Sequence, residues 1–158
     1  MKRILAFVLG LALSASAFAT LQYTTTHRNN AMSDLVTAIG GTGELVILTG
    51  AQPANVATAD TGTELAALPL SATPGTVSGG VLTFNAITSE TAVGSGTAAH
   101  FLICTTSTVA NCTAASSTTR VLQGSVGTSG ADLNFPTTSF SSGETISVSS
   151  FTITANGA

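Results

Sequence analysis

The sequence predicts an all-β fold: a single β-sandwich or jelly-roll-like domain of about eight strands with one short N-terminal helix. Two observations predict it. Short runs of β-branched and aromatic residues are separated by glycine and proline turns along most of the chain. In the last third, apolar residues alternate with serine and threonine. A period of two indicates strands with one buried and one solvated face.

The start of the chain has the pattern of a secretory signal peptide. A charged beginning and the apolar run Ile4–Leu13 precede the small-x-small sequence Ala17-Phe18-Ala19. We therefore predict a signal peptide over residues 1–19, cleaved between Ala19 and Thr20. Residues 20–158 are then one β-sandwich domain, long enough to bury a core. The alternative is an N-terminal helix that the mature protein keeps.

Charged side chains are scarce. After residue 19 the only fixed cations are Arg28 and Arg120, against seven acidic residues in the whole chain. Proteins that bind nucleic acid or anionic lipid need a basic surface, so we expect neither a nucleic-acid partner nor, in the mature form, a membrane partner. High hydrophobicity combined with low charge favours a packed chain over a disordered one.

The N-terminal part predicts one strand and the helix. Leu21–Thr26 is a short β-prone run. Asn30 is a predicted helix N-cap, and an apolar helix face follows, consisting of Ala31, Leu35, Ala38 and Ile39. Gly40-Gly41 then closes the helix.

The middle of the chain predicts three strands. Glu44–Thr49 is continuously apolar, which is typical of a strand covered on both faces. Glu64–Leu70 is a further strand, and Pro69 places it at a sheet edge or sends it into a turn. We expect Pro74–Gly80 to be a loop and Val81–Ile87 to be a strand.

The C-terminal part predicts the remaining strands. Thr97–Thr105 and Thr119–Ser125 are expected to pair as a hairpin, and Ala131–Phe135 is short because Pro136 follows it. Glu144–Ala155 alternates throughout, but its parity changes at Ser149-Ser150. We predict either one long strand with a β-bulge at Ser149 and Ser150, or two strands with a tight break.

The chain has two cysteines, Cys104 and Cys112. In an exported protein such a pair predicts one disulfide, here closing a short loop at the tip of the hairpin. The spacing matches neither a zinc site nor a redox CxxC motif.

No residue pattern states a catalytic chemistry. His27 and His100 are the only histidines, and we expect His100, beside Phe101 in a strand, to be a hydrogen-bonded structural residue. The sequence contains no G-x-S-x-G elbow, and its carboxylates are scattered singly. The sequence therefore predicts no enzyme, no metal and no cofactor.

Several segments, in this order along the chain, resemble a family of small bacteriophage virion proteins. They are Leu21–Thr25, Arg28–Ala31, Ile47–Ala54, Gly79–Thr83, Gly124–Leu133 and Val148–Ile153. The resemblance implies a non-enzymatic structural subunit of the virion, such as a decoration or tail-associated protein. It supplies no catalytic residues.

Two functions follow from these observations. The first is a virion subunit, whose partners are copies of itself or other particle proteins. Phage particles assemble inside the cell, so such a subunit needs no signal peptide. The second is an exported cell-surface or extracellular protein, a self-assembling filament or adhesive subunit, located outside the cell or in the periplasm. A secreted hydrolase is a third hypothesis, and only His27 and His100 could serve as its histidine base.

Overall fold

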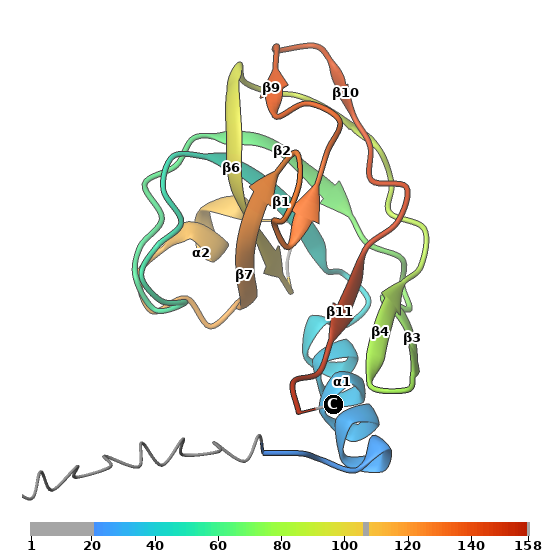
Figure 1. The fold of residues 1–158 in the computed structure, drawn as a ribbon. Coiled ribbons are helices and arrows are strands. Elements are labelled where there is room, and N and C mark those ends of the chain that lie inside the picture. Colours follow the sequence, from blue (N-terminus) through green and yellow to red (C-terminus); the bar gives the residue numbers. More distant parts are fainter. Residues whose placement is uncertain (1–20, 106–107, 158) are drawn as a thin grey trace, which may run out of the picture.

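The computed structural model describes residues 21–105 and 108–157, and these form a fold made mostly of strands (Figure 1). The predicted signal peptide and its cleavage site between Ala19 and Thr20 lie outside the described residues. The helices are α1 (Thr25–Ile39) and α2 (Val109–Thr113). The strands are β1 (Glu44–Thr49), β2 (Glu64–Pro69), β3 (Gly75–Ser78), β4 (Val81–Phe84), β5 (Glu90–Thr91), β6 (Gly96–Cys104), β7 (Arg120–Gly127), β8 (Leu133–Asn134), β9 (Ser139–Phe140), β10 (Thr145–Ile146) and β11 (Thr152–Thr154). A β-rich fold with one N-terminal helix is confirmed.

The main sheet has the strand order β2-β1-β6-β7-β8, and β9 pairs with the beginning of β6. The pairs β2–β1, β1–β6 and β6–β7 are antiparallel, whereas β8 runs parallel to β7. The predicted hairpin of β6 and β7 is confirmed. Pro69 lies at the end of β2, an edge strand of this sheet, as its missing N–H donor requires.

Both faces of β1, an inner strand of the main sheet, are buried. Along β1, Leu45 and Ile47 belong to the larger core, and Val46 and Leu48 belong to a smaller core on the opposite face. All four side chains are fully buried. Successive side chains of a strand point to opposite faces, and here both faces are covered. This explains why the sequence of β1 is continuously apolar, as predicted.

Two small sheets complete the fold. β3, β4 and β11 form one, and β5 pairs with β10 in the other. Leu82 of β4, Ile146 of β10 and Phe151, just before β11, belong to the larger core. Figure 1 shows the β3–β4 hairpin and β11 beside α1, while α2 lies against the main sheet. The expected loop at 74–80 is wrong, because its residues 75–78 form β3 and pair with β4.

The helix α1 begins earlier than expected. Thr24 is the N-cap, and its hydroxyl accepts a hydrogen bond from the N–H of His27 at 3.3 Å. The predicted N-cap at Asn30 is therefore wrong, as is a strand over residues 21–26. The predicted end is confirmed: Gly40, at a φ of 69°, donates its N–H to the carbonyl of Val36. Ile39 is buried as expected, but Ala31 and Ala38 are exposed.

The single long strand expected over residues 144–155 is not formed. β10 pairs with β5, and β11 pairs with β4 in a different sheet. Ser149 and Ser150 lie between these strands, outside either one, so they do not form a bulge within one strand. The change of parity at these residues therefore marks a break between two strands, which was the alternative prediction.

Candidate functional site

A disulfide joins Cys104, at the end of β6, to Cys112 in α2, with their Cα atoms 5.9 Å apart. The predicted pairing is confirmed. Both cysteines are fully buried in the smaller core, together with Val46, Leu48 and Leu102. The bridge therefore holds α2 against the main sheet, on the face opposite the larger core.

A buried pair of His100 and Asp60 lies on the same face of the main sheet. The Nε2 atom of His100 is 2.6 Å from Oδ2 of Asp60, and neither side chain is exposed to solvent. The Nδ1 atom of His100 lies 3.2 Å from the carbonyl oxygen of Gly50. The second oxygen of Asp60, Oδ1, accepts the N–H of Gly62 at 2.6 Å. Every polar atom of the pair thus has a partner.

The hydrogen-bond partners fix the orientation of the imidazole ring. A carbonyl oxygen can only accept, so Nδ1 of His100 carries a hydrogen and donates it to Gly50. Nε2 of His100 and Oδ2 of Asp60 then satisfy each other in the interior. The pair thereby avoids the cost of burying a polar group without a partner.

Arg120, at the start of β7, is the third polar residue of this region. Its guanidinium donates to the carbonyl oxygens of Cys112 at 2.9 Å, Val56 at 3.1 Å, Thr58 at 2.9 Å and Ala114 at 3.5 Å. Burial lowers the pKa of Arg120 from its usual value, and the nearby charge of Asp60 opposes this effect. One cation therefore gathers carbonyl groups from the segment after β1 and from α2.

The three residues act as a structural anchor. Backbone hydrogen bonds from Asp60 N–H to the Thr113 carbonyl, at 2.8 Å, and from Ser116 N–H to the Ala57 carbonyl, at 2.7 Å, join the same two segments. A histidine–carboxylate pair can serve a hydrolase when one ring nitrogen faces a nucleophile. Here both nitrogens of His100 are occupied and the side chain is fully buried. This geometry is that of a hydrogen-bonded structural histidine, as expected. We call Asp60, His100 and Arg120 the polar anchor.

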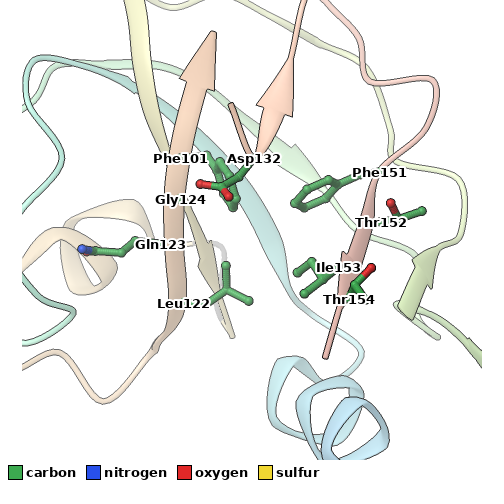
Figure 2. Close-up of a pocket in the computed structure, with 9 residues that line it drawn as sticks. All are labelled: Phe101, Leu122, Gln123, Gly124, Asp132, Phe151, Thr152, Ile153 and Thr154. Carbon is green, nitrogen blue, oxygen red and sulfur yellow. The ribbon is translucent and has the colours of Figure 1, made fainter. Parts of the chain in front are cut away.

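A groove of about 350 Å³ lies between β7 and β11. Figure 2 shows Leu122 on the β7 side and Phe151 and Ile153 on the β11 side, with Phe101 and Gly124 at the level of the main sheet. Gly124 is required there, because a Cβ atom at this position would lie 2.6 Å from ring carbons of Phe101. The rings of Phe101 and Phe151 meet edge to face, with centroids 5.3 Å apart.

On the β11 side of the groove, backbone groups are left without a neighbouring strand. The N–H of Phe84 bonds the carbonyl of Phe151, and the N–H of Ala155 bonds the carbonyl of Gly80. In an antiparallel pair alternate residues face the partner strand, so Thr152 and Thr154 direct their N–H and C=O groups away from β4. In the described part of the chain β11 pairs only with β4, which leaves these groups facing the groove.

The β7 side of the groove has a similar edge. The N–H of Ser125 bonds Oδ2 of Asp132 at 2.8 Å, and the carbonyl of Gly127 accepts from the N–H of Phe135. Odd-numbered residues of this part of β7 thus face away from β6, and Gln123 follows the same parity. β8 pairs with β7 only at Val126 and Gly127, so the edge at Gln123 is open toward the groove.

The open part of the β7 edge ends at Ser125, where the side chain of Asp132 binds the backbone. Its Oδ2 accepts from both the N–H and the hydroxyl of Ser125, at 2.8 and 2.7 Å. The hydrogen bond from the backbone of Ser125, which has the larger effect, and the one from its side chain lower the pKa of Asp132 below its usual value. Asp132 therefore takes the place that a neighbouring strand would have at Ser125.

The sequence predicted the pairing of Cys104 with Cys112 and a structural role for His100, but it did not identify the partner of His100. Asp60 lies 40 positions before His100 along the chain. Its local sequence, Ala59-Asp60-Thr61-Gly62, indicates only a turn in which the carboxylate accepts the N–H two residues later. Arg120, one of two cations after residue 19, could have been suspected because a lone cation in an apolar strand start needs acceptors.

No protein-family model matches the chain, and no match was found among curated proteins or among solved structures. Within residues 21–105 and 108–157, no group of three or more His, Cys, Asp or Glu side chains is arranged to hold a metal ion. No helix in these residues is both long enough and apolar enough to span a membrane.

Proposed function

We propose that this protein is a non-enzymatic structural subunit of a bacteriophage virion, a decoration or tail-associated protein that assembles with copies of itself or with other particle subunits. The observation that carries the proposal is the groove between β7 and β11, where two strand edges face each other without a strand between them. Unpaired strand edges are the surfaces through which β-proteins add strands from other chains.

The polar anchor supports the non-enzymatic part of the proposal. The His100–Asp60 pair is the arrangement in the described chain most similar to a catalytic dyad. Both ring nitrogens and both carboxylate oxygens of this pair make hydrogen bonds that fix the segment after β1. The resemblance to small virion proteins, in segments that follow the same order from Leu21 to Ile153, supports the proposal that the protein belongs to a virion.

For the architecture we propose a β-sandwich in the broad sense. The larger core contains Ile47 and Phe101 from the main sheet, and Leu82, Ile146 and Phe151 from the smaller sheets and the segment between them. These two groups of strands are the candidates for the two layers of a sandwich.

The alternative is an exported filament or adhesive subunit, and the disulfide favours it. Disulfides form and persist mainly outside the reducing cytoplasm. The predicted signal peptide belongs to this alternative, whereas a virion subunit assembled inside the cell keeps residues 1–19.

An intact-mass measurement on purified, nuclease-resistant particles tests the proposal. We expect the chain at high copy number in the particles, beginning at Met1 or Lys2. Its absence from particles, together with a secreted form that begins at Thr20, contradicts the proposal and supports the exported subunit. The same spectrum reports the disulfide, because the bridge lowers the mass by two hydrogens.

A further inference from the structure

We propose that Asn156 is a site of spontaneous covalent modification, at which deamidation through a succinimide releases the contact between Gly157 and Tyr23. The reaction needs only water, and the inference does not depend on the proposed function. Two observations carry it. One is the chemistry of the Asn156-Gly157 pair, and the other is the way the fold holds the residues on either side of Asn156.

Asn156-Gly157 is the only asparagine–glycine pair in the sequence. An asparagine side chain cyclises when the backbone nitrogen of the next residue attacks its amide carbon, and a side chain on that next residue hinders the attack. Glycine has no side chain and leaves the backbone the most freedom. Asparagine is one of the thermolabile residues of proteins. The six other asparagines all precede a residue that has a side chain, and they are Asn29, Asn30, Asn55, Asn85, Asn111 and Asn134.

Both reacting groups are free in the structure. Asn156 is exposed, and within residues 21–105 and 108–157 neither its side chain nor the N–H of Gly157 takes part in a hydrogen bond. A hydrogen bond on either group would have to break before the ring closes. Side-chain hydrogen bonds hold four of the other asparagines, which are Asn29, Asn55, Asn85 and Asn134.

The fold requires glycine at position 157. Gly157 has a φ of 87°, in the left-handed region that residues with a side chain rarely adopt. A Cβ atom at this position would also lie 2.5 Å from Cδ2 of Tyr23. Any other residue here would therefore be strained and would displace the Tyr23 ring. The structure thus explains why the chain has a glycine directly after Asn156.

Hydrogen bonds hold the backbone on both sides of Asn156. The N–H of Ala155 donates to the carbonyl of Gly80 at 2.8 Å. The carbonyl of Gly157 accepts from the N–H of Tyr23 at 2.9 Å, which joins the end of the described chain to the residue before the N-cap of α1 (Figure 1). The length of backbone between Ala155 and Gly157 therefore decides whether both contacts are made together.

The reaction balances with water as the only co-reactant. The Gly157 nitrogen gives its proton to solvent and attacks Cγ of Asn156, so a new C–N bond closes the succinimide ring. The bond from Cγ to the side-chain nitrogen breaks, and that nitrogen takes up a proton and leaves as ammonia. Water then opens the ring. Cleavage between Cγ and the Gly157 nitrogen gives aspartate, and cleavage between the backbone carbonyl carbon and this nitrogen gives isoaspartate.

The two products differ in the path of the main chain. Aspartate keeps the original backbone and adds a carboxylate. Isoaspartate routes the backbone through Cβ and Cγ, so one extra carbon lies between Ala155 and Gly157. With Ala155 held on Gly80, the carbonyl of Gly157 is then displaced from the N–H of Tyr23. Isoaspartate therefore releases the start of α1 from the end of the described chain, whereas aspartate does not.

Peptide mapping of the full-length, oxidised chain tests the site. The folded protein is incubated at neutral pH below its unfolding temperature, and mass spectrometry follows conversion at each asparagine. We expect Asn156 to convert at least about tenfold faster than any other asparagine, which corresponds to an activation free energy lower by about 1.4 kcal/mol. A parallel sample in urea gives the rate without the fold.

Two variants show that the reacting group is the Asn156 side chain. Asn156→Gln lengthens the side chain, so the five-membered ring cannot form, and we expect conversion at this position to be lost. Asn111→Gln changes an exposed asparagine of α2 in the same way and is the matched control. We expect it to leave conversion at Asn156 unchanged.

Hydrogen exchange tests the released contact. In the isoaspartate form we expect the amide of Tyr23 to exchange about tenfold or more faster than in the unmodified chain. The amide of Ala155, which precedes the added carbon, should keep its protection and serves as the internal reference. Asn156→Asp carries the new charge on an unchanged backbone, and it should protect Tyr23 as the wild type does.

Three results overturn the inference. One is conversion at Asn156 no faster than at the other asparagines of the folded chain. Another is conversion in urea but not in the folded protein, which means that the fold shields the pair. The third is an isoaspartate form in which the Tyr23 amide is as well protected as in the unmodified chain.

Discussion

The Nε2 atom of His100 and the Oδ2 atom of Asp60 are 2.6 Å apart in a region where neither side chain is exposed to solvent. This contact joins the centre of β6 to the long segment between β1 and β2. Because each side chain is the other's hydrogen-bond partner, removing either one leaves a buried polar group without its partner. The structure of the segment after β1 therefore depends on a polar contact rather than on apolar packing alone.

Replacing Asp60 is the most direct test of the polar anchor. Asp60→Ala leaves Nε2 of His100 without a partner in the interior, so we expect the free energy of unfolding to fall by about 1–3 kcal/mol. Urea denaturation measures the change. Asp34→Asn, at an exposed position of α1, is the control and should change stability by less than about 0.5 kcal/mol. Equal effects of the two substitutions would show that the buried pair contributes little.

Arg120→Lys tests how the guanidinium joins two segments. A single ammonium group cannot reach the carbonyls of Cys112, Val56 and Thr58 together, so we expect a loss of about 2 kcal/mol. The amides of Asp60 and Ser116 should exchange faster, since they join the segments that Arg120 holds. The amide of Asn85, which bonds Pro74 elsewhere in the fold, should be unchanged. Unchanged exchange at Asp60 and Ser116 would mean that the disulfide alone holds this region.

Removal of the disulfide should weaken the fold without abolishing it. For the short loop between Cys104 and Cys112, replacement of both by alanine should lower the free energy of unfolding by about 2–3 kcal/mol. Urea denaturation of the variant, compared with oxidised wild type, measures this. Because both sulfurs are buried, thiol labelling must be done on denatured, unreduced protein. Two labelled thiols per chain would contradict the bridge.

Glu44, at the start of β1, should make stability fall as the pH rises. Burial, followed by the charges of Glu64 and Glu90, raises the pKa of Glu44 above its usual value of 4.5. The folded state therefore holds this proton more tightly than the unfolded state, and the associated stability is lost as the pH rises from about 4.5 through the folded pKa. Glu44→Gln should raise stability at pH 7 and flatten this part of the pH profile. A variant less stable than wild type at pH 7 would contradict this account.

Asp132 should make stability fall as the pH is lowered, which is the opposite of the effect of Glu44. Hydrogen bonds from Ser125 lower its pKa below the usual value of 3.8, so its contribution is complete above that value and is lost as the pH falls through the folded pKa. Asp132→Asn should therefore be less stable than wild type at neutral pH and should lose less stability on acidification below about pH 4. Thermal unfolding measured at several pH values between about 2 and 7 gives the difference. Parallel acid profiles of the two proteins would show that Ser125 does not stabilise the carboxylate.

The features that could be predicted from the sequence are those with a signal in a short stretch of chain. The apolar run Glu44–Thr49 predicts β1 because a strand buried on both faces needs apolar side chains at successive positions. The hairpin of β6 and β7, the closing Gly40 and the disulfide follow from patterns within short stretches of chain.

Tertiary structure decided the features that depend on distant partners. Residues 144–155 alternate like one strand, but β5 and β4 offer separate edges, and the chain pairs with each in turn. Asp60, His100 and Arg120 are scattered along the sequence, and only the packing of the segment after β1 onto β6 and β7 makes them one polar anchor. The open edges at Thr152, Thr154 and Gln123 likewise have no local signal, because whether a backbone group is paired depends on which strand lies beside it.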